Sequence, residues 1–420
     1  MAGMRRSSVS LTQKTVRSIR LFGLLVAQLC AYSMLSALCF ACPLYLFDCS
    51  GSSTLYGTVA AIAFVPGVLA TPAGGILADR GRHRGVLVVL GIVLMAASLL
   101  FIPMRRSLPL AVVVVAMLCV QYGIQSLLKP MLQIETVCMT GPEKVERATA
   151  LVSQITMASN ILGPVVGTAV YGCFGIDALC ETAALTFAIS ALLFGGALKR
   201  NASSGMTGDS TTCSTCRNDF RESIRYLFQN ASLLVGFLLA AILNLALVGL
   251  TIGAPVIVAK HLGMQSSFVG IIEVAMGLGG LVGSGLVGIW PHRFSFKDIC
   301  RYVAMICFGA VPIIVTLLSG PDELAFAAFV AGSAWVMAWA SIASVEIVSF
   351  VQRSAPKELC GKVLALVYMM LSCATPIGQL VYGLAYDRWT PAIVFAGMLG
   401  MLTLTTALFY RLKSRLWRLS

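Results

Sequence analysis

Long apolar runs separated by short polar segments dominate this chain. Each run is close to the roughly 20 residues that an α-helix needs to cross a bilayer, and none shows the period-two alternation of a transmembrane barrel. The pattern predicts an all-α membrane protein with twelve transmembrane helices. The runs lie near residues 20–47, 55–78, 85–104, 108–139, 148–174, 178–198, 231–258, 267–289, 299–319, 324–351, 363–386 and 391–410.

Composition supports a membrane protein. Of the 420 residues, 58% are hydrophobic and only 11% are charged, and the mean hydropathy is +0.89. A soluble domain carries about 25% charged residues. The first apolar run follows a basic segment, as in a signal peptide, but it is too long and has no clear cleavage site. We therefore expect an uncleaved first helix.

The positions of the basic residues predict the topology. The net charge is +13, and most of the 30 lysines and arginines fall in the segments that share one side with the N-terminus. The opposite loops hold only Arg105, Arg106, Lys260 and Arg388. Because cytoplasmic loops concentrate Lys and Arg, both termini are expected in the cytoplasm, with the protein in the cell membrane. The basic excess then reflects topology, and we expect no nucleic-acid partner.

The apolar runs divide into two sets of six around a polar stretch. We expect an N-terminal six-helix bundle over 1–198, a cytoplasmic linker over 199–230 and a C-terminal bundle over 231–420. Within the linker, the apolar side chains of 217–228 fall on one helical face and the arginines on the other, which predicts an amphipathic helix. Two bundles of six helices are typical of transporters built from repeats.

A weak internal echo fits a duplication. The segment Gly167-Thr168-Ala169-Val170-Tyr171-Gly172 in the fifth run matches Gly378-Gln379-Leu380-Val381-Tyr382-Gly383 in the eleventh. Glu135 and Glu346 are separated by the same offset, near the inner ends of the fourth and tenth runs. The echo predicts two related, pseudo-symmetric bundles.

Several motifs occur in order along the chain. The loop between the second and third runs reads Gly75-Ile76-Leu77-Ala78-Asp79-Arg80-Gly81-Arg82-His83-Arg84, and the fifth run contains Gly163-Pro164-Val165-Val166-Gly167. Further on come Tyr226-Leu227-Phe228-Gln229-Asn230 and Ala355-Pro356-Lys357-Glu358-Leu359-Cys360-Gly361-Lys362-Val363. Together these motifs resemble the major facilitator superfamily, in particular the drug-efflux branch that includes macrolide efflux proteins and the enterobactin exporter.

The resemblance implies a secondary transporter that works by alternating access. It also has departures: Arg82 and His83 replace the second Gly and the first Arg of the loop pattern, and Cys119 stands where the family has an intramembrane Arg. That Arg is often tied to proton coupling. The loop between the eighth and ninth runs has no matching Asp.

The loop is expected to act as a conformational latch. The Asp79 carboxylate can cap a helix N-terminus, which carries partial positive charge, and Arg80, Arg82 and Arg84 can reach Glu135. Alternatively, the arginines only enforce topology, and we favour that explanation for Arg82. Gly163, Pro164 and Gly167 form an antiporter-type motif that lets a helix bend and approach its neighbour closely. In exporters this motif is associated with sealing the inner side.

Intramembrane polar residues are the candidates for a proton or substrate site. Glu273 is either a proton carrier or a carboxyl group facing a wet vestibule. Lys129 can contact an anionic substrate or a carboxylate on another helix. Gln28, Tyr32 and Gln125 can line a mostly apolar cavity that suits amphipathic cargo, although for any one of them we favour hydrogen bonding between helices. The same two possibilities hold for Gln121, Gln154, Asn160 and Asn244.

Other chemistries lack their motifs. No phosphate-binding loop occurs, and His83, His261 and His292 are scattered at helix ends, so we expect no enzyme, no metal and no cofactor apart from a proton gradient. The pair Cys213 and Cys216 stands alone, which favours an ordinary reduced loop over a zinc site.

We therefore expect a monomeric exporter of a small amphipathic molecule (a drug, macrolide or siderophore-like compound) by proton antiport. The alternatives are an importer or lysolipid flippase of the same fold, a membrane sensor or scaffold that does not transport, and, least favoured, an enzyme embedded in the membrane.

Overall fold

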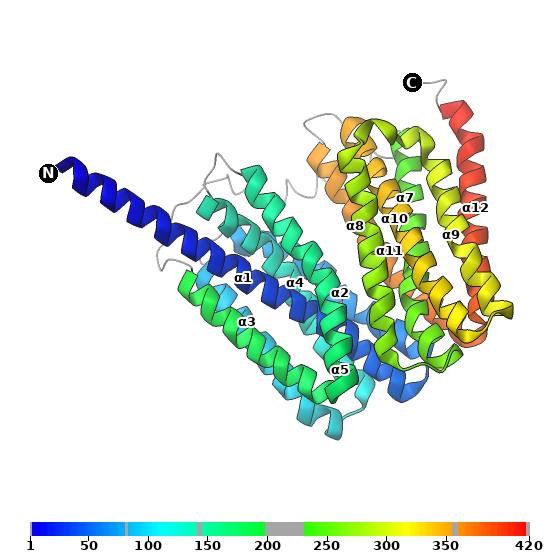
Figure 1. The fold of residues 1–420 in the computed structure, drawn as a ribbon, viewed down its shortest axis with the longest axis horizontal. Helices are drawn as coiled ribbons and strands as arrows, with labels where there is room; N and C mark the ends of the chain where they lie inside the picture. The colour runs from blue at the N-terminus through cyan, green and yellow to red at the C-terminus, as the bar shows by residue number, and fades with distance from the viewer. Residues whose placement is uncertain (1, 80–82, 141–144, 198–230, 355–359, 417–420) are drawn as a thin grey trace. The chain divides into compact units, whose positions relative to one another are not determined.

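The computed structural model describes residues 2–79, 83–140, 145–197, 231–354 and 360–416, without some side chains inside these ranges, among them those of Asp79, Arg84 and Lys129. The described residues are helical and contain no strand (Figure 1). The long helices are α1 (Ala2–Ser50), α2 (Ser53–Asp79), α3 (His83–Ser107), α4 (Leu110–Thr140), α5 (Val145–Ala197), α7 (Ala231–Pro255), α8 (Val269–Ile289), α9 (Ile299–Ser319), α10 (Asp322–Ser354), α11 (Cys360–Arg388) and α12 (Pro391–Leu416).

These helices account for the apolar runs, and the expected all-α membrane fold is confirmed. Among the described residues, nine helices are long and apolar enough to cross a membrane. One of them, α5, contains two of the expected runs, so each of the twelve runs falls on one of the long helices. A π-helical turn, Val256–His261, extends α7, and short 3-10 turns at Ser266–Phe268, Pro291–Arg293 and Phe296–Asp298 lead into α8 and α9.

Gly175 separates the two halves of α5. Its φ of 84° and ψ of 176° are not helical, and glycine adopts positive φ without the steric penalty of a Cβ atom. Just after this turn, Asp177 forms an ion pair with Arg105 at the end of α3. Arg105 also donates a hydrogen bond of 2.7 Å to the hydroxyl oxygen of Tyr45 on α1. The turn is thus fastened to two neighbouring helices.

The chain forms two compact units. The first comprises Met1–Leu46 and Ile62–Met206, and the second comprises Phe47–Ala61 and Thr207–Ser420. The start of α2 therefore packs with the second unit, while the rest of the same helix packs with the first. The predicted linker 199–230 and its amphipathic helix lie outside the described residues. The boundaries expected for the two bundles stay a prediction.

In the first unit, α3, α4 and α5 pack against one another, and α1 carries a stripe of buried apolar side chains. Leu24, Ala27, Ala31, Leu35 and Leu38 recur at helical spacing and are at most 2% exposed. A stripe of this kind buries one face of a helix against its neighbours.

In the second unit, α10 packs against α8 and α9, α7 against α11 and α12, and α9 against α12 (Figure 1). The α8–α10 pair is close because of two glycines one turn apart. A Cβ atom at Gly279 or Gly283 would collide with the backbone carbonyl of Ala334 or Ala338, respectively. These glycines of the eighth helix therefore serve packing, as small residues do between membrane helices.

Large apolar side chains also cover the outer surfaces of the helices. Leu192 is 77% exposed, Leu69 is 73% exposed and Leu318 is 69% exposed. Such exposed leucines suit a lipid environment, where apolar side chains carry no hydration penalty and each helix forms its backbone hydrogen bonds internally.

Candidate functional site

The expected latch lies at the junction of α2 and α3. Asp79 is the last residue of α2, and Arg84 is the second residue of α3. Their side chains, and the whole of Arg80, lie outside the described residues, so their pairing with Glu135 stays a prediction. Glu135 itself is buried in α4, at 8% exposure. A buried carboxyl group in a membrane helix needs partners, and Glu135 does make interactions.

The antiporter-type motif is a close contact between α5 and α1. Gly163, Pro164 and Gly167 are all buried. A Cβ atom at Gly163 would collide with Cβ of Ser36, and one at Gly167 would lie 2.8 Å from the carbonyl oxygen of Ala37. Only glycine allows this approach, which agrees with the expected close packing of the motif.

Hydroxyl groups extend the same contact along α1 and α5. Ser33 donates a hydrogen bond of 3.3 Å to the Ser159 hydroxyl oxygen, and Ser159 donates one of 3.4 Å to the carbonyl oxygen of Leu29. Hydrogen bonds between membrane helices add modestly to packing, and here they fix the register of the two helices.

A second face of α1 carries polar groups without partners. Gln28 is fully buried, and neither of its amide atoms has a hydrogen-bond partner among the described residues. The hydroxyl group of Tyr32, one turn further on, is likewise buried and unpartnered. Groups at positions i and i+4 share a helix face. Because buried polar groups are normally satisfied, this face is the strongest candidate for binding.

Further polar residues lie on α4, which contacts α1 through Cys39. Cys39 Sγ of α1 lies 3.3 Å from Gln121 Oε1, within hydrogen-bond distance, whereas Gln121 Nε2 has no partner among the described residues. Gln125, one turn further along α4, is half-buried. Lys129 continues the same face, but its side chain lies outside the described residues. Structure and sequence together place Gln28, Tyr32, Gln121 and Gln125 on two helices in contact.

Replacing Gln28 by leucine should stabilise the folded protein. The substitution keeps the volume and removes two buried polar groups that lack partners, whose desolvation costs about 1–3 kcal/mol. We expect a higher melting temperature for Gln28→Leu in detergent, measured by the fluorescence of a thiol-reactive dye or by light scattering.

The matched variant is Gln121→Leu, which also loses the contact with Cys39 and should gain less. A lower melting temperature for Gln28→Leu would assign a structural role to the amide and remove the main argument for a binding face. Stabilisation at the expense of function is typical of residues kept for binding.

Glu273 lies just over one turn after the start of α8 and is half-buried. Among the described residues it has no hydrogen bond or ion pair. The phenol group of Tyr56, near the start of α2, is within electrostatic range of its carboxyl group. A carboxyl group in this position can exchange a proton without breaking an ion pair, which keeps both interpretations of Glu273 open.

Asn244 and the remaining predicted polar residues are less suited to binding. The Asn244 carbonyl oxygen accepts a hydrogen bond of 3.4 Å from Thr375, and Gln154 and Asn160 are exposed on α5. Within the part of the chain that the structure describes, no three His, Cys, Asp or Glu side chains come together as a metal site.

One heavily hydrogen-bonded carboxylate was not predicted from the sequence. Asp387, in the last turn of α11, accepts hydrogen bonds from the backbone N–H groups of Ser53 (2.9 Å) and Thr54 (2.7 Å). Its signal in the sequence is a second copy of the pattern G-x-x-x-D-R. Gly383, Asp387 and Arg388 repeat the spacing of Gly75, Asp79 and Arg80.

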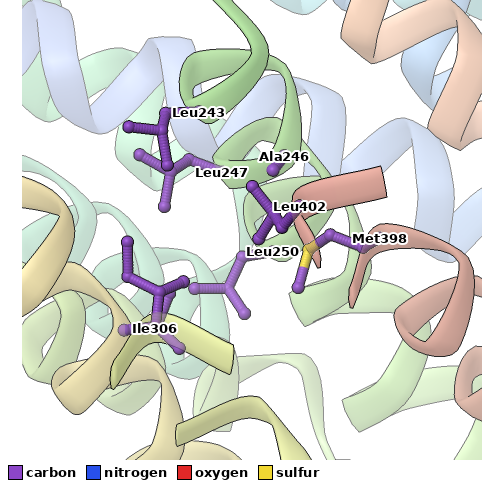
Figure 2. A pocket seen from close by; sticks show the side chains of 8 residues that line it. Leu243, Ala246, Leu247, Leu250, Ile306, Met398 and Leu402 are labelled. Atoms are coloured by element: carbon purple, nitrogen blue, oxygen red, sulfur yellow. The ribbon is translucent and has the colours of Figure 1, made fainter. Parts of the chain in front are cut away.

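A small cavity of about 10 Å³ lies in the second unit, between α7, α9, α10 and α12. Figure 2 shows its lining, which consists of Leu243, Ala246, Leu247, Leu250, Ile306, Met398 and Leu402, with Val336 completing the wall. The lining has no polar side chain, and the volume is that of about one water molecule. This cavity is a gap in helix packing and is too small for a cargo molecule.

Comparison with known proteins adds a family and a fold. The family model described as Major Facilitator Superfamily matches residues 24–378. Macrolide efflux protein A of Streptococcus pyogenes is 21% identical over 346 residues, which cover 82% of this chain and 84% of that protein.

Solved structures of transporters share the fold. The nucleoside transporter NupG superposes with a TM-score of 0.74 at 14% identity, over 93% of this chain and 98% of that one. A bacterial homologue of the human lysosomal transporter Spinster, in its inward-facing and unoccupied conformation, superposes with a TM-score of 0.73 at 12% identity, over 96% of this chain and 97% of that one. At these identities the likeness concerns the fold.

Proposed function

This chain belongs to the Major Facilitator Superfamily and is a membrane transporter, and we propose that it exports a small amphipathic molecule in exchange for protons. The cargo class is that of drugs, macrolides and siderophore-like compounds. We place both termini in the cytoplasm and the protein in the cell membrane, because the basic residues concentrate in the segments on that side. We also propose that it works as a monomer.

The contact of the antiporter-type motif with α1 carries this proposal. Ser36 and Ala37 of α1 approach Gly163 and Gly167 so closely that a Cβ atom at either glycine would collide with them. In exporters of the family this motif is associated with sealing the inner side, and the relative named for macrolide efflux matches 82% of this chain at 21% identity.

The two faces of α1 explain how the contact can act on cargo. Ser33, Ser36 and Ala37 face α5, whereas Gln28 and Tyr32 lie on a different face of the same helix. Because a helix moves as a rigid element, a shift at the α1–α5 contact also moves the two polar side chains. Unpartnered polar groups set among apolar ones suit a cargo with a few polar atoms on a large apolar body.

Export can be tested with labelled erythromycin, a macrolide, and with the dye ethidium. Cells that express the protein should accumulate less of at least one probe than cells without it, because a pump lowers the internal concentration. An uncoupler should abolish the difference, since the motive force is a proton gradient. In proteoliposomes, transport of the same probe should change the internal pH.

Other outcomes point to other functions. Higher accumulation in expressing cells would indicate an importer, and flux without any pH change would exclude proton antiport. Flux of neither probe, with a lysolipid moved between leaflets instead, would favour a flippase. A substitution at the α1–α5 contact, such as Gly163→Ala, has a matched control in Gly123→Ala, because a Cβ atom at Gly123 of α4 meets nothing within 4 Å.

A further inference from the structure

The N-terminus of α2 is capped by a residue from the other end of the chain. The Asp387 carboxylate accepts hydrogen bonds from the N–H groups of Ser53 (2.9 Å) and Thr54 (2.7 Å) and from the Ser52 hydroxyl group (3.0 Å). Ser52 Oγ in turn accepts from the N–H of Leu55 at 3.2 Å. The first N–H groups of a helix have no acceptors within the helix. Here Asp387 of α11 and the hydroxyl group of Ser52 act as the acceptors.

The charge of Asp387 suits this role. The residue lies just beyond the expected apolar run 363–386. Partial burial opposes ionisation, but the hydrogen bonds from Thr54, Ser53 and Ser52 outweigh it and hold the pKa of Asp387 well below its usual range. The stabilisation from a lowered pKa is complete above the usual aspartate pKa of about 4 and is lost only as the pH falls through the lowered value. The cap is therefore charged at physiological pH.

A close backbone contact lies directly beside the cap. A Cβ atom at Gly57 of α2 would collide with the carbonyl oxygen of Gln379 and lie 3.0 Å from Cα of Gly383. The Thr54 hydroxyl group also donates to the carbonyl oxygen of Gly383 at 3.4 Å. We call the cap and this glycine contact together the α2–α11 clasp.

Two exposed polar contacts surround the clasp. Lys260, in the turn after α7, lies 3.4 Å from the Asp387 carboxylate, and the Ser266 hydroxyl group donates to the carboxylate of Asp48 at 2.6 Å. Ion pairs exposed to water contribute little. The hydrogen bonds from the backbone N–H groups and the glycine contact therefore provide most of the stabilisation of the α2–α11 clasp.

The clasp sits where the same helix changes its packing. The residues of α2 up to Ala61 belong to the second unit, and those from Ile62 onward belong to the first. Alternating access requires relative motion of the two halves of a transporter. Such motion must either bend α2 near this junction or release its first turn from α11.

We propose that Asp387 is a positioning residue of the transport cycle, whose clasp on the first turn of α2 holds one end of the transporter closed and must release for that end to open. By the charge pattern this is the outward end. At the opposite end of α2, Asp79 occupies the Asp position of the matching G-x-x-x-D-R segment. The inference rests on the alternating access of the proposed function and does not depend on the cargo or the coupling ion.

Hydrogen–deuterium exchange of the full-length protein in lipid nanodiscs tests the clasp directly. In Asp387→Ala, amides of residues 53–61 should exchange about five- to tenfold faster, because a helix loses its cap. Amides near the inner ends of α4 and α10, in 131–140 and 341–350, should exchange more slowly, because the inner end closes as the outer end opens. Asp387→Asn should have a smaller effect, since its amide oxygen still accepts a hydrogen bond.

Matched variants separate the clasp from general destabilisation. Lys260→Ala leaves the cap in place and should change exchange by less than about twofold. Asp322→Ala removes another exposed carboxylate, from the start of α10, and should behave like the unmodified protein. Gly57→Leu forces α2 away from α11 and should reproduce Asp387→Ala, whereas Gly397→Leu, at a position with nothing within 4 Å, should not.

Two results would overturn the proposal. One is faster exchange confined to residues 53–61 with no opposite change at the inner ends, which indicates a cap that is only structural. The other is an unchanged ratio of KM to maximal rate for ethidium or erythromycin in Asp387→Ala. The exchange measurement needs no cargo, so failure of the export proposal leaves it valid.

Discussion

Alanine at Gly163 should abolish most transport. The added methyl group collides with Cβ of Ser36 and lies 2.9 Å from the backbone nitrogen of Ala37, so α5 must move away from α1. Overpacking of this kind costs about 1–3 kcal/mol. If the misfit falls on one of the two access states, each 1.4 kcal/mol shifts their ratio about tenfold. We expect an initial rate of macrolide or dye export at least about tenfold lower, measured in everted vesicles.

A second substitution should restore the lost transport. The variant Ser36→Gly removes the two atoms nearest the new methyl group, so Gly163→Ala combined with Ser36→Gly should regain most of the rate. The same partner should not rescue Gly167→Ala, whose methyl group meets the backbone carbonyl and Cα of Ala37 instead. If Gly163→Ala alone and the two double variants all had equal rates, the close contact would have no bearing on transport.

The sequence predicted the helices well because their signal is local. Length and apolarity alone mark a membrane helix, and all twelve runs fall on long helices. The sharp turn at Gly175 was also implied, since one run ends and another begins beside it. By contrast, the change of packing partner within α2 depends on contacts between residues far apart in the chain, which no periodicity encodes.

The site was predicted less completely. Gly163 and Gly167 were identified by a motif, and the structure adds that Ser36 and Ala37 of α1 leave no room for a Cβ atom at either position. Gln28 and Tyr32 were named as polar residues in an apolar run, but only the structure shows that they lack partners. Asp387 was missed because it accepts hydrogen bonds from backbone N–H groups of α2, and a backbone donor leaves no complementary charge in the sequence.

Glutamine at Glu273 should uncouple transport from the proton gradient. The substitution keeps the size of the side chain and removes its ability to carry a proton. In proteoliposomes with an imposed pH gradient, Glu273→Gln should lose uphill accumulation of the probe while still exchanging labelled for unlabelled probe at equal concentrations. A coupling carboxyl group must be able to lose and regain its proton in each cycle, and no ion pair among the described residues holds that of Glu273.

Glu346→Gln is the matched control, because Glu346 is a more deeply buried carboxyl group in the same unit, at 4% exposure, and already makes interactions. It should lower stability without removing the response to the gradient. An unchanged pH response in Glu273→Gln would leave Glu273 as a carboxyl group facing a wet vestibule.

The neighbour of Glu273 sharpens this test. Tyr56, within electrostatic range of its carboxyl group, directly precedes Gly57 of the α2–α11 clasp. A change of charge on Glu273 thus acts on the same first turns of α2 that Asp387 holds. If protonation and opening are linked, Glu273→Gln should also alter hydrogen exchange in residues 53–61, and Tyr56→Phe should weaken that effect. Loss of coupling with unchanged exchange in these residues would place the proton step elsewhere in the cycle.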